Sequence, residues 1–148
     1  MRHRLGLLPF IVLIISLFSP ALGFDSSEII DHRQKEMKIA QTLTRDVNLK
    51  LLVNDFTGAV TSAQKIVNWS RNLRRLFPEG SEASVQNLSS ASSDIWENPK
   101  AFQKAIDASE KIATELFNAL LDGQLENAKA KGSRLPLTCS ACHQRFRN

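Results

Sequence analysis

The sequence predicts an all-α protein, an antiparallel up-down-up-down four-helix bundle. Beyond the first two dozen residues the chain is rich in Ala, Leu, Lys, Gln, Glu and Asn, and no segment alternates apolar and polar residues as a strand would. Four segments instead repeat apolar residues at steps of three and four, the spacing that places side chains on one face of a helix. Because most of the links between these segments are short, consecutive helices are expected to be antiparallel neighbours.

The first helix is expected to begin near Ser26-Ser27-Glu28, where serine can act as the N-cap, and to run to about Leu52. The residues on its predicted inward face are Ile30, Arg33, Met37, Ala40, Thr44, Val47 and Leu51. The second helix is expected to start at Asn54 or Asp55, both good N-cap residues, and to end at Pro78 and Gly80.

The longest connection, residues 79–98, is rich in serine. Such a loop would be mobile by itself, but Ile95 and Trp96 give it apolar side chains that can pack against the bundle. Asn98-Pro99 then predicts a helix start, with a capping residue followed by proline at the first helical position. This third helix is expected to stop at Asp122-Gly123.

The fourth helix is predicted from Gln124 to about Phe146, with an interruption. An interior proline removes a backbone hydrogen bond and clashes with the preceding turn. We therefore expect a break or kink between Gly132 and Leu135, with Pro136 opening a second helical piece.

The chain begins like a secretory signal peptide. A basic start, Met1-Arg-His-Arg4, precedes an apolar run from Leu5 to Phe18 and the small-residue stretch Ser19-Pro-Ala-Leu-Gly23. We expect residues 1–23 to be removed on export to the periplasm, leaving a single domain of residues 24–148. The alternative is an uncleaved membrane anchor, for which the apolar run is short.

The charge balance argues against a nucleic-acid partner. Residues 1–23 contain two of the 19 basic side chains and no acid, so 17 basic side chains face 15 acidic ones in the remaining domain. This small excess is not arranged as a basic stripe interleaved with aromatic residues. After signal cleavage no stable membrane insertion is expected either.

Cys139-Ser-Ala-Cys142-His143 is the chemically informative motif. Steps of three and four put the two thiols and the imidazole on one face of a helix, where the cysteines can form thioethers with one haem and the histidine can bind its iron. Three alternatives fit less well. A thioredoxin-like motif needs a βαβ context, a zinc site needs four ligands, and a lone disulfide here would close a very small loop.

Three stretches together resemble the class II cytochromes c, the cytochrome c′-like family. They are Arg33-Gln-Lys-Glu-Met37-Lys38, then Leu76-Phe-Pro-Glu-Gly-Ser81 with Ile95-Trp-Glu-Asn-Pro99, and finally the haem motif through Arg147. The resemblance implies a four-helix bundle with one covalent haem c near the C-terminus. It is closest to the low-spin cytochrome c-556 type, in which a methionine of the first helix binds the iron opposite the histidine.

Met37 stands at that methionine's position, so the resemblance implies His143 and Met37 as the iron ligands. Without it, the spacing alone favours an ordinary core residue at Met37, as a methionine on an apolar helical face usually is. Arg33 is four residues earlier, so a helix can present both to the same haem, and its cation could pair with a propionate. His32, the competing ligand, would face away from that haem. Arg147 matches a family arginine that can lie near the proximal ligand or simply be solvated.

The expected function is periplasmic single-electron transfer between transiently bound redox proteins, by a monohaem cytochrome that is a monomer or a homodimer. No nucleophile or acid–base pair suggests an enzyme. If Met37 does not bind the iron, the alternative is a five-coordinate protein that binds nitric oxide or other small gases. A haem-free helical binding protein is the third possibility.

Overall fold

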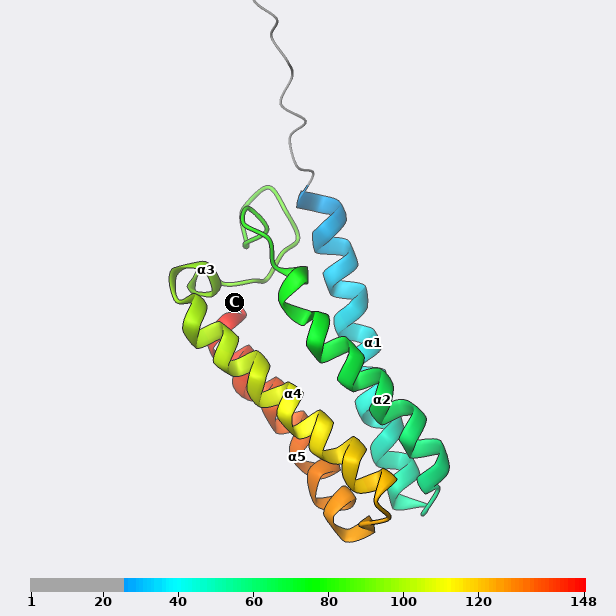
Figure 1. The fold of residues 1–148 in the computed structure, drawn as a ribbon. Coiled ribbons are helices and arrows are strands. Elements are labelled where there is room, and N and C mark those ends of the chain that lie inside the picture. The colour runs from blue at the N-terminus through cyan, green and yellow to red at the C-terminus, as the bar shows by residue number, and fades with distance from the viewer. Residues whose placement is uncertain (1–25) are drawn as a thin grey trace, which may run out of the picture.

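Four long helices carry the fold in the computed structural model, which describes residues 26–148. They are α1 (Ser26–Leu52), α2 (Phe56–Asn72), α4 (Pro99–Leu121) and α5 (Leu125–Phe146). Successive long helices run in opposite directions (Figure 1), α1 packs against α2 and α5, and α4 packs against the same two helices. The predicted up-down-up-down bundle is therefore confirmed. The expected signal peptide, residues 1–23, lies outside the described residues.

The helix starts follow local sequence signals, with one difference. Asp55 is the N-cap of α2, and its carboxylate accepts a hydrogen bond from the backbone N–H of Gly58 at 2.9 Å. Pro99 is the first residue of α4, as predicted. Asn98 precedes it at the N-cap position, but its side chain donates to Asp94 and does not cap the helix. The start of α4 is therefore set by the fixed backbone angle of Pro99 and not by a side-chain cap.

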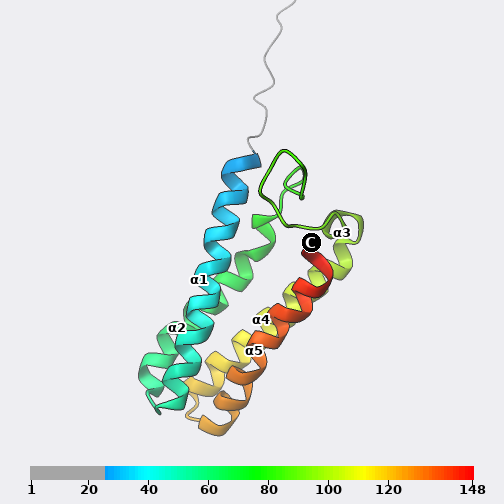
Figure 2. The same cartoon turned by 180° about the vertical axis from the view of Figure 1, so that it is seen from behind.

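The second helix is expected to continue to Pro78, but α2 ends at Asn72 and the chain goes on directly as the 3₁₀ turn η1 (Leu73–Leu76). The long connection contains more regular structure than the sequence predicts, because the short helix α3 (Asp94–Glu97) lies just before α4. Ile95 in α3 is only 2% exposed, which confirms that it pins this connection against the bundle. The connection crosses the end of the bundle at which the chain terminates (Figure 2).

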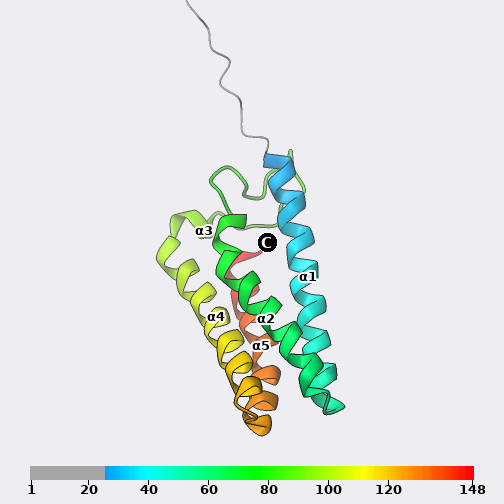
Figure 3. The same cartoon turned by 45° about the vertical axis from the view of Figure 1, so that its right-hand side comes forward.

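The core consists of two apolar clusters, one toward each end of the bundle. The first holds Val47, Leu51, Ala59, Ala63, Ile66, Val67, Ile112, Ala113, Leu116, Ala119, Leu120, Ala128 and Leu135. The second, which we call the C-terminal cluster, holds Leu73, Leu76, Ala91, Ile95, Phe102, Ile106 and Phe146. The α1–α2 pair and the α4–α5 pair diverge toward the end with the C-terminal cluster (Figures 1 and 2). Figure 3 gives a side view in which α2 lies in front, between α1 and α4.

The expected break in the last helix is wrong, because α5 is continuous from Leu125 to Phe146 with Pro136 inside it. Gly132 is buried where α5 meets α1, and a Cβ there would lie 2.7 Å from Leu51 Cδ1 and 2.9 Å from Asn48 Oδ1. The glycine thus allows close approach of the two helices and does not end one. Pro136 is exposed, where solvent can replace the hydrogen bond that its ring removes.

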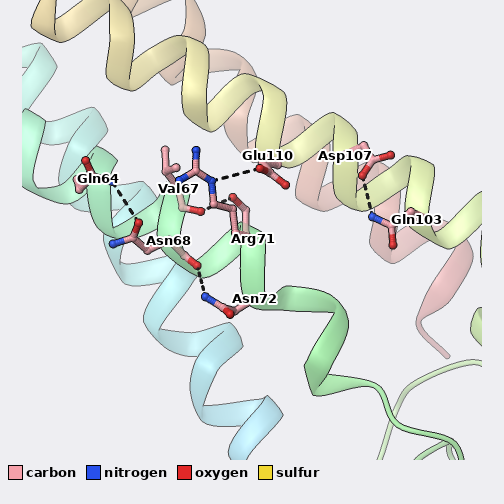
Figure 4. A network of polar contacts seen from close by, with 9 residues as sticks. Gln64, Val67, Asn68, Arg71, Asn72, Gln103, Asp107 and Glu110 are labelled. Atoms are coloured by element: carbon pink, nitrogen blue, oxygen red, sulfur yellow. Dashed lines mark hydrogen bonds and ion pairs between the residues drawn. The ribbon is translucent and has the colours of Figure 1, made fainter.

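Polar contacts cover the outer surface of α2 and α4. Arg71 Nε in α2 lies 3.3 Å from Glu110 Oε1 in α4, so one ion pair links the two helices at the surface (Figure 4). Exposed pairs of this kind contribute little to stability, so the apolar clusters hold the helices together. Within residues 26–148, no helix is long and apolar enough to cross a membrane.

The close contact at Gly132 gives the first prediction. Gly132→Val should lower the free energy of unfolding by about 1–3 kcal/mol, because the added methyl groups must displace Leu51 and Asn48. Chemical denaturation monitored by circular dichroism measures this. Ser133→Val, at the exposed neighbouring position, is the control for placing a β-branched residue in this turn of α5. Equal effects of the two substitutions would contradict the proposed role of Gly132.

Candidate functional site

The Cys-x-x-Cys-His motif lies in the last two turns of α5, where the C-terminal cluster closes the bundle. Cys139 and Cys142 are both half-buried free thiols, and Cys142 packs against the C-terminal cluster. His143 is exposed. Cys142 thus faces the core at this end of the bundle, Cys139 is half-buried, and the imidazole of His143 lies nearer to solvent.

The electrostatics of the thiols do not suit disulfide exchange. Burial raises the pKa of Cys142 to about 11, and the nearby Cys139 contributes in the same direction. Burial also raises the pKa of Cys139. Reactive Cys-x-x-Cys motifs use a thiol whose pKa is lowered, so these protonated thiols do not resemble a thioredoxin-like site. Among residues 26–148, no group of three or more His, Cys, Asp or Glu side chains could hold a metal ion.

The surroundings of His143 favour the neutral form of its imidazole. Partial burial of the ring, and secondly the positive charge of Arg147, lower the pKa of His143. A lower pKa favours the neutral imidazole, the form that binds metals. Arg147 is exposed, and its backbone pairs with Ala91 of the long connection. Its charge therefore acts on His143 although its side chain lies at the surface.

Met37 lies in α1 and also packs, half-buried, against the C-terminal cluster. The structure therefore brings Met37 and Cys142, which are far apart in sequence, to the same apolar region. His32 is exposed, on an outer groove between α1 and α2, as expected from its position on the helix.

Arg33 is buried, with only 5% of its surface exposed, and it binds the long connection. Its guanidinium donates to the carbonyl oxygens of Leu76 and Ser81 at 3.0 and 2.8 Å. It also donates to the hydroxyl oxygens of Ser81 and Ser89, each at 2.8 Å. Sequence reasoning missed both serines, because serines are so frequent in this loop that none stands out.

No carboxylate balances this buried charge: Arg33 takes part in none of the ion pairs formed among residues 26–148. Burial lowers its pKa, which shows that the charged form is held at a cost. The face of Phe77 lies 4.8 Å from the guanidinium carbon and supplies a weak attraction. A further anion at this end of the bundle would be stabilised by Arg33.

Two tryptophans at the same end of the bundle carry buried donors that lack acceptors. In the part of the chain that the structure describes, the indole N–H groups of Trp69 and Trp96 have no hydrogen-bond partner, and both rings pack against the C-terminal cluster. A buried donor without an acceptor is unfavourable. Two thiols, an imidazole, a thioether, a buried cation and two free donors form a set that fits haem, which has two vinyl groups, one iron and two propionates.

An all-α bundle with a Cys-x-x-Cys-His motif in its last helix defines a haem-attaching helical protein. Residues 28–147 match the family described as Cytochrome C′. Cytochrome c′ from Rhodospirillum rubrum is 33% identical over 129 residues, which cover 86% of each chain. The chain therefore belongs to the cytochrome c′ family, and carries its covalently attached haem c.

Solved structures agree on the fold. Cytochrome c′ from Rubrivivax gelatinosus superposes with a TM-score of 0.73 at 18% identity, covering 83% of this chain and 97% of the other. The nitric oxide complex of a leucine-to-alanine variant of cytochrome c prime from Alcaligenes xylosoxidans gives 0.73 at 17% identity, covering 83% and 95%. A carbon monoxide-bound leucine-to-glycine variant of that protein gives 0.74 at 17%, covering 84% and 98%.

The buried guanidinium gives the second prediction. Arg33→Lys should lower the free energy of unfolding by about 1–3 kcal/mol, because an ammonium cannot reach all four acceptors and leaves buried groups unsatisfied. Thermal unfolding measures the loss, and limited proteolysis should show earlier cleavage within residues 77–93. Lys35→Ala, on the exposed side of α1, should change neither. A variant as stable as the parent would overturn this role.

The ion pair between α3 and α5 gives a pH dependence. Arg145 Nε lies 2.6 Å from Asp94 Oδ2, and this hydrogen bond lowers the pKa of Asp94 below its ordinary value of 3.8. Because the folded-state pKa is the lower one, the stabilisation is present above pH 3.8 and is lost as the pH falls through the folded-state pKa. Asp94→Asn should therefore lower the Tm at pH 7, and the difference from the parent should shrink in acid. Asp107→Asn, in an exposed pair with Gln103, is the control.

Proposed function

We propose that the protein is a periplasmic haem c protein that binds nitric oxide or other small gases at its iron, on the side where Met37 lies. The observation that carries this proposal is the packing of Met37 and Cys142 against one apolar cluster, although they come from opposite ends of the chain. A cofactor attached at Cys142 would then lie in the apolar region that also holds Met37.

Each residue of the site has a distinct part in this proposal. Cys139 and Cys142 would hold the haem through thioethers, and His143 would supply the neutral imidazole for the iron. Arg33, Trp69 and Trp96 would stabilise the propionates from the C-terminal end of the bundle. When bound, the haem supplies an iron that can take up a diatomic gas or exchange one electron.

Two observations favour gas binding. The chain belongs to the cytochrome c′ family, and the Alcaligenes structures that share its fold are complexes with nitric oxide and carbon monoxide. The C-terminal cluster and the half-buried Met37 would surround the open side of the iron with apolar groups. Such surroundings admit small uncharged gases and disfavour charged ligands.

Electron transfer is the second candidate, and Met37 itself is the observation that favours it. It is the one methionine of the chain beyond Met1, and it packs in the same cluster as Cys142. A thioether bound to the iron opposite His143 would keep the iron low-spin and raise its potential. Gas binding would then require displacement of Met37.

Optical spectra of the holoprotein and of Met37→Leu separate the two functions. Leucine nearly conserves the volume, so the cluster should stay packed. For gas binding we expect a high-spin spectrum in both proteins, with stoichiometric nitric oxide uptake by the reduced form. A low-spin spectrum with the weak red sulfur-to-iron band, lost in Met37→Leu, would contradict the gas-binding proposal and establish Met37 as a ligand. Leu43→Met, elsewhere on α1, controls for added thioether alone.

A further inference from the structure

A second surface lies beside the motif, on the outer side of the bundle between α4 and α5. It is a groove of about 470 Å³, whose residues come from both helices. We call it the α4–α5 groove. Its apolar floor is made by Ala101, Ala105, Ala108, Ile112, Leu137 and Ala141. Leu137 is 64% exposed there, next to the exposed Ala108 and Ala141, and contiguous exposed apolar patches often mark interaction sites.

The groove shares Cys142 with the haem motif, whereas Cys139 and His143 do not line it. The helical period explains this: Cys142 stands on the α4 side of α5, and His143 stands one residue further round, toward α1. Cys142 thus lies between the apolar region that holds Met37 and the outer groove. A partner seated in the groove would contact the residue proposed to hold the haem.

The charges at the groove are all of one sign. Lys104, Arg134 and Arg145 line it, and no carboxylate does. Arg145 is paired with Asp94, and Arg134 attracts Glu115, whose carboxylate is bound more closely by Lys131 at 2.6 Å. Lys104 forms no ion pair among the described residues. The rim therefore keeps a net positive charge around an apolar floor.

We propose that the α4–α5 groove is the docking surface for an acidic redox protein, a one-electron carrier whose apolar contact patch is ringed by carboxylates. Such a ring would pair with Lys104 and Arg134, and the complementary charges would guide the partner to the groove.

This inference rests on the proposed attachment of haem at Cys142, but not on which ligand the iron takes. Electron transfer needs contact with a second redox protein, and a ferrous gas binder needs a source of one electron. We expect a weak, transient complex, because the groove is small compared with a stable protein–protein interface. Because the attraction comes from solvent-exposed charges, the affinity should fall strongly as salt is added.

The test is an NMR titration of the isotope-labelled, reduced holoprotein with a short synthetic peptide of glutamate and leucine residues. We expect shifts at the amides of Ala101, Ala105 and Ala141, and an affinity that falls when salt is added. The charge reversal Lys104→Glu with Arg134→Glu should weaken binding at least about tenfold. The matched reversal Lys38→Glu with Arg45→Glu, on exposed positions of α1, should weaken it far less.

Equal losses in the two double variants, or shifts confined to other helices, would overturn the docking proposal. The proposed gas-binding function is tested separately, by the optical spectrum and by nitric oxide uptake. The peptide titration does not depend on either result. Leu137→Asn keeps the charges and removes the apolar anchor, so unchanged affinity in this variant would also count against the groove. The circular dichroism of each variant shows whether it remains folded.

Discussion

Arg33 places a permanent positive charge inside the end of the bundle where the haem motif lies. Four hydrogen bonds from its guanidinium reach Leu76, Ser81 and Ser89, so residues after α2 are fixed to the first helix. The backbone N–H of Ser92 and of Asn148 then join the same connection to the end of α5. The buried cation, bound to uncharged oxygens, therefore helps to hold the motif in place relative to α1, together with the packing of α5 on α1 at Gly132. It also leaves a charge that an anionic cofactor could balance.

The helices could be predicted because their apolar spacing, caps and proline all indicate the same structure. The interruption expected in the last helix shows the limit of this reasoning, since Gly132 and Pro136 are helix breakers by intrinsic propensity. The close approach of Leu51 and Asn48, from a helix 80 residues earlier, makes the glycine necessary there. No local pattern contains that information. The short helix α3 and the hydrogen bonds of Ser81 and Ser89 could not be predicted from the sequence either, because the groups that they contact lie on other elements.

The candidate site divides in the same way. The motif on α5 is recognisable from one helical turn, so Cys139, Cys142 and His143 follow directly from the sequence. The role of Met37 does not, because a methionine that fills apolar space and a methionine that binds iron have the same spacing. Packing against the cluster that also contacts Cys142 brings Met37 to the right region. Whether the Met37 sulfur binds the iron depends on the strength of the bond between sulfur and iron, which the spacing of residues along a helix does not determine.

The divergence of the helix pairs toward the C-terminal cluster connects the two surfaces of α5. The first cluster, at the far end, supplies the packing that lets the two helix pairs diverge at this end. α5 must then present its motif inward while its opposite flank, packed on α4, remains accessible as a groove. Cys142 belongs to both sides because it stands at the boundary between them. A bundle of this design can shelter one side of its cofactor for a gas while leaving a short route to a protein partner on the other.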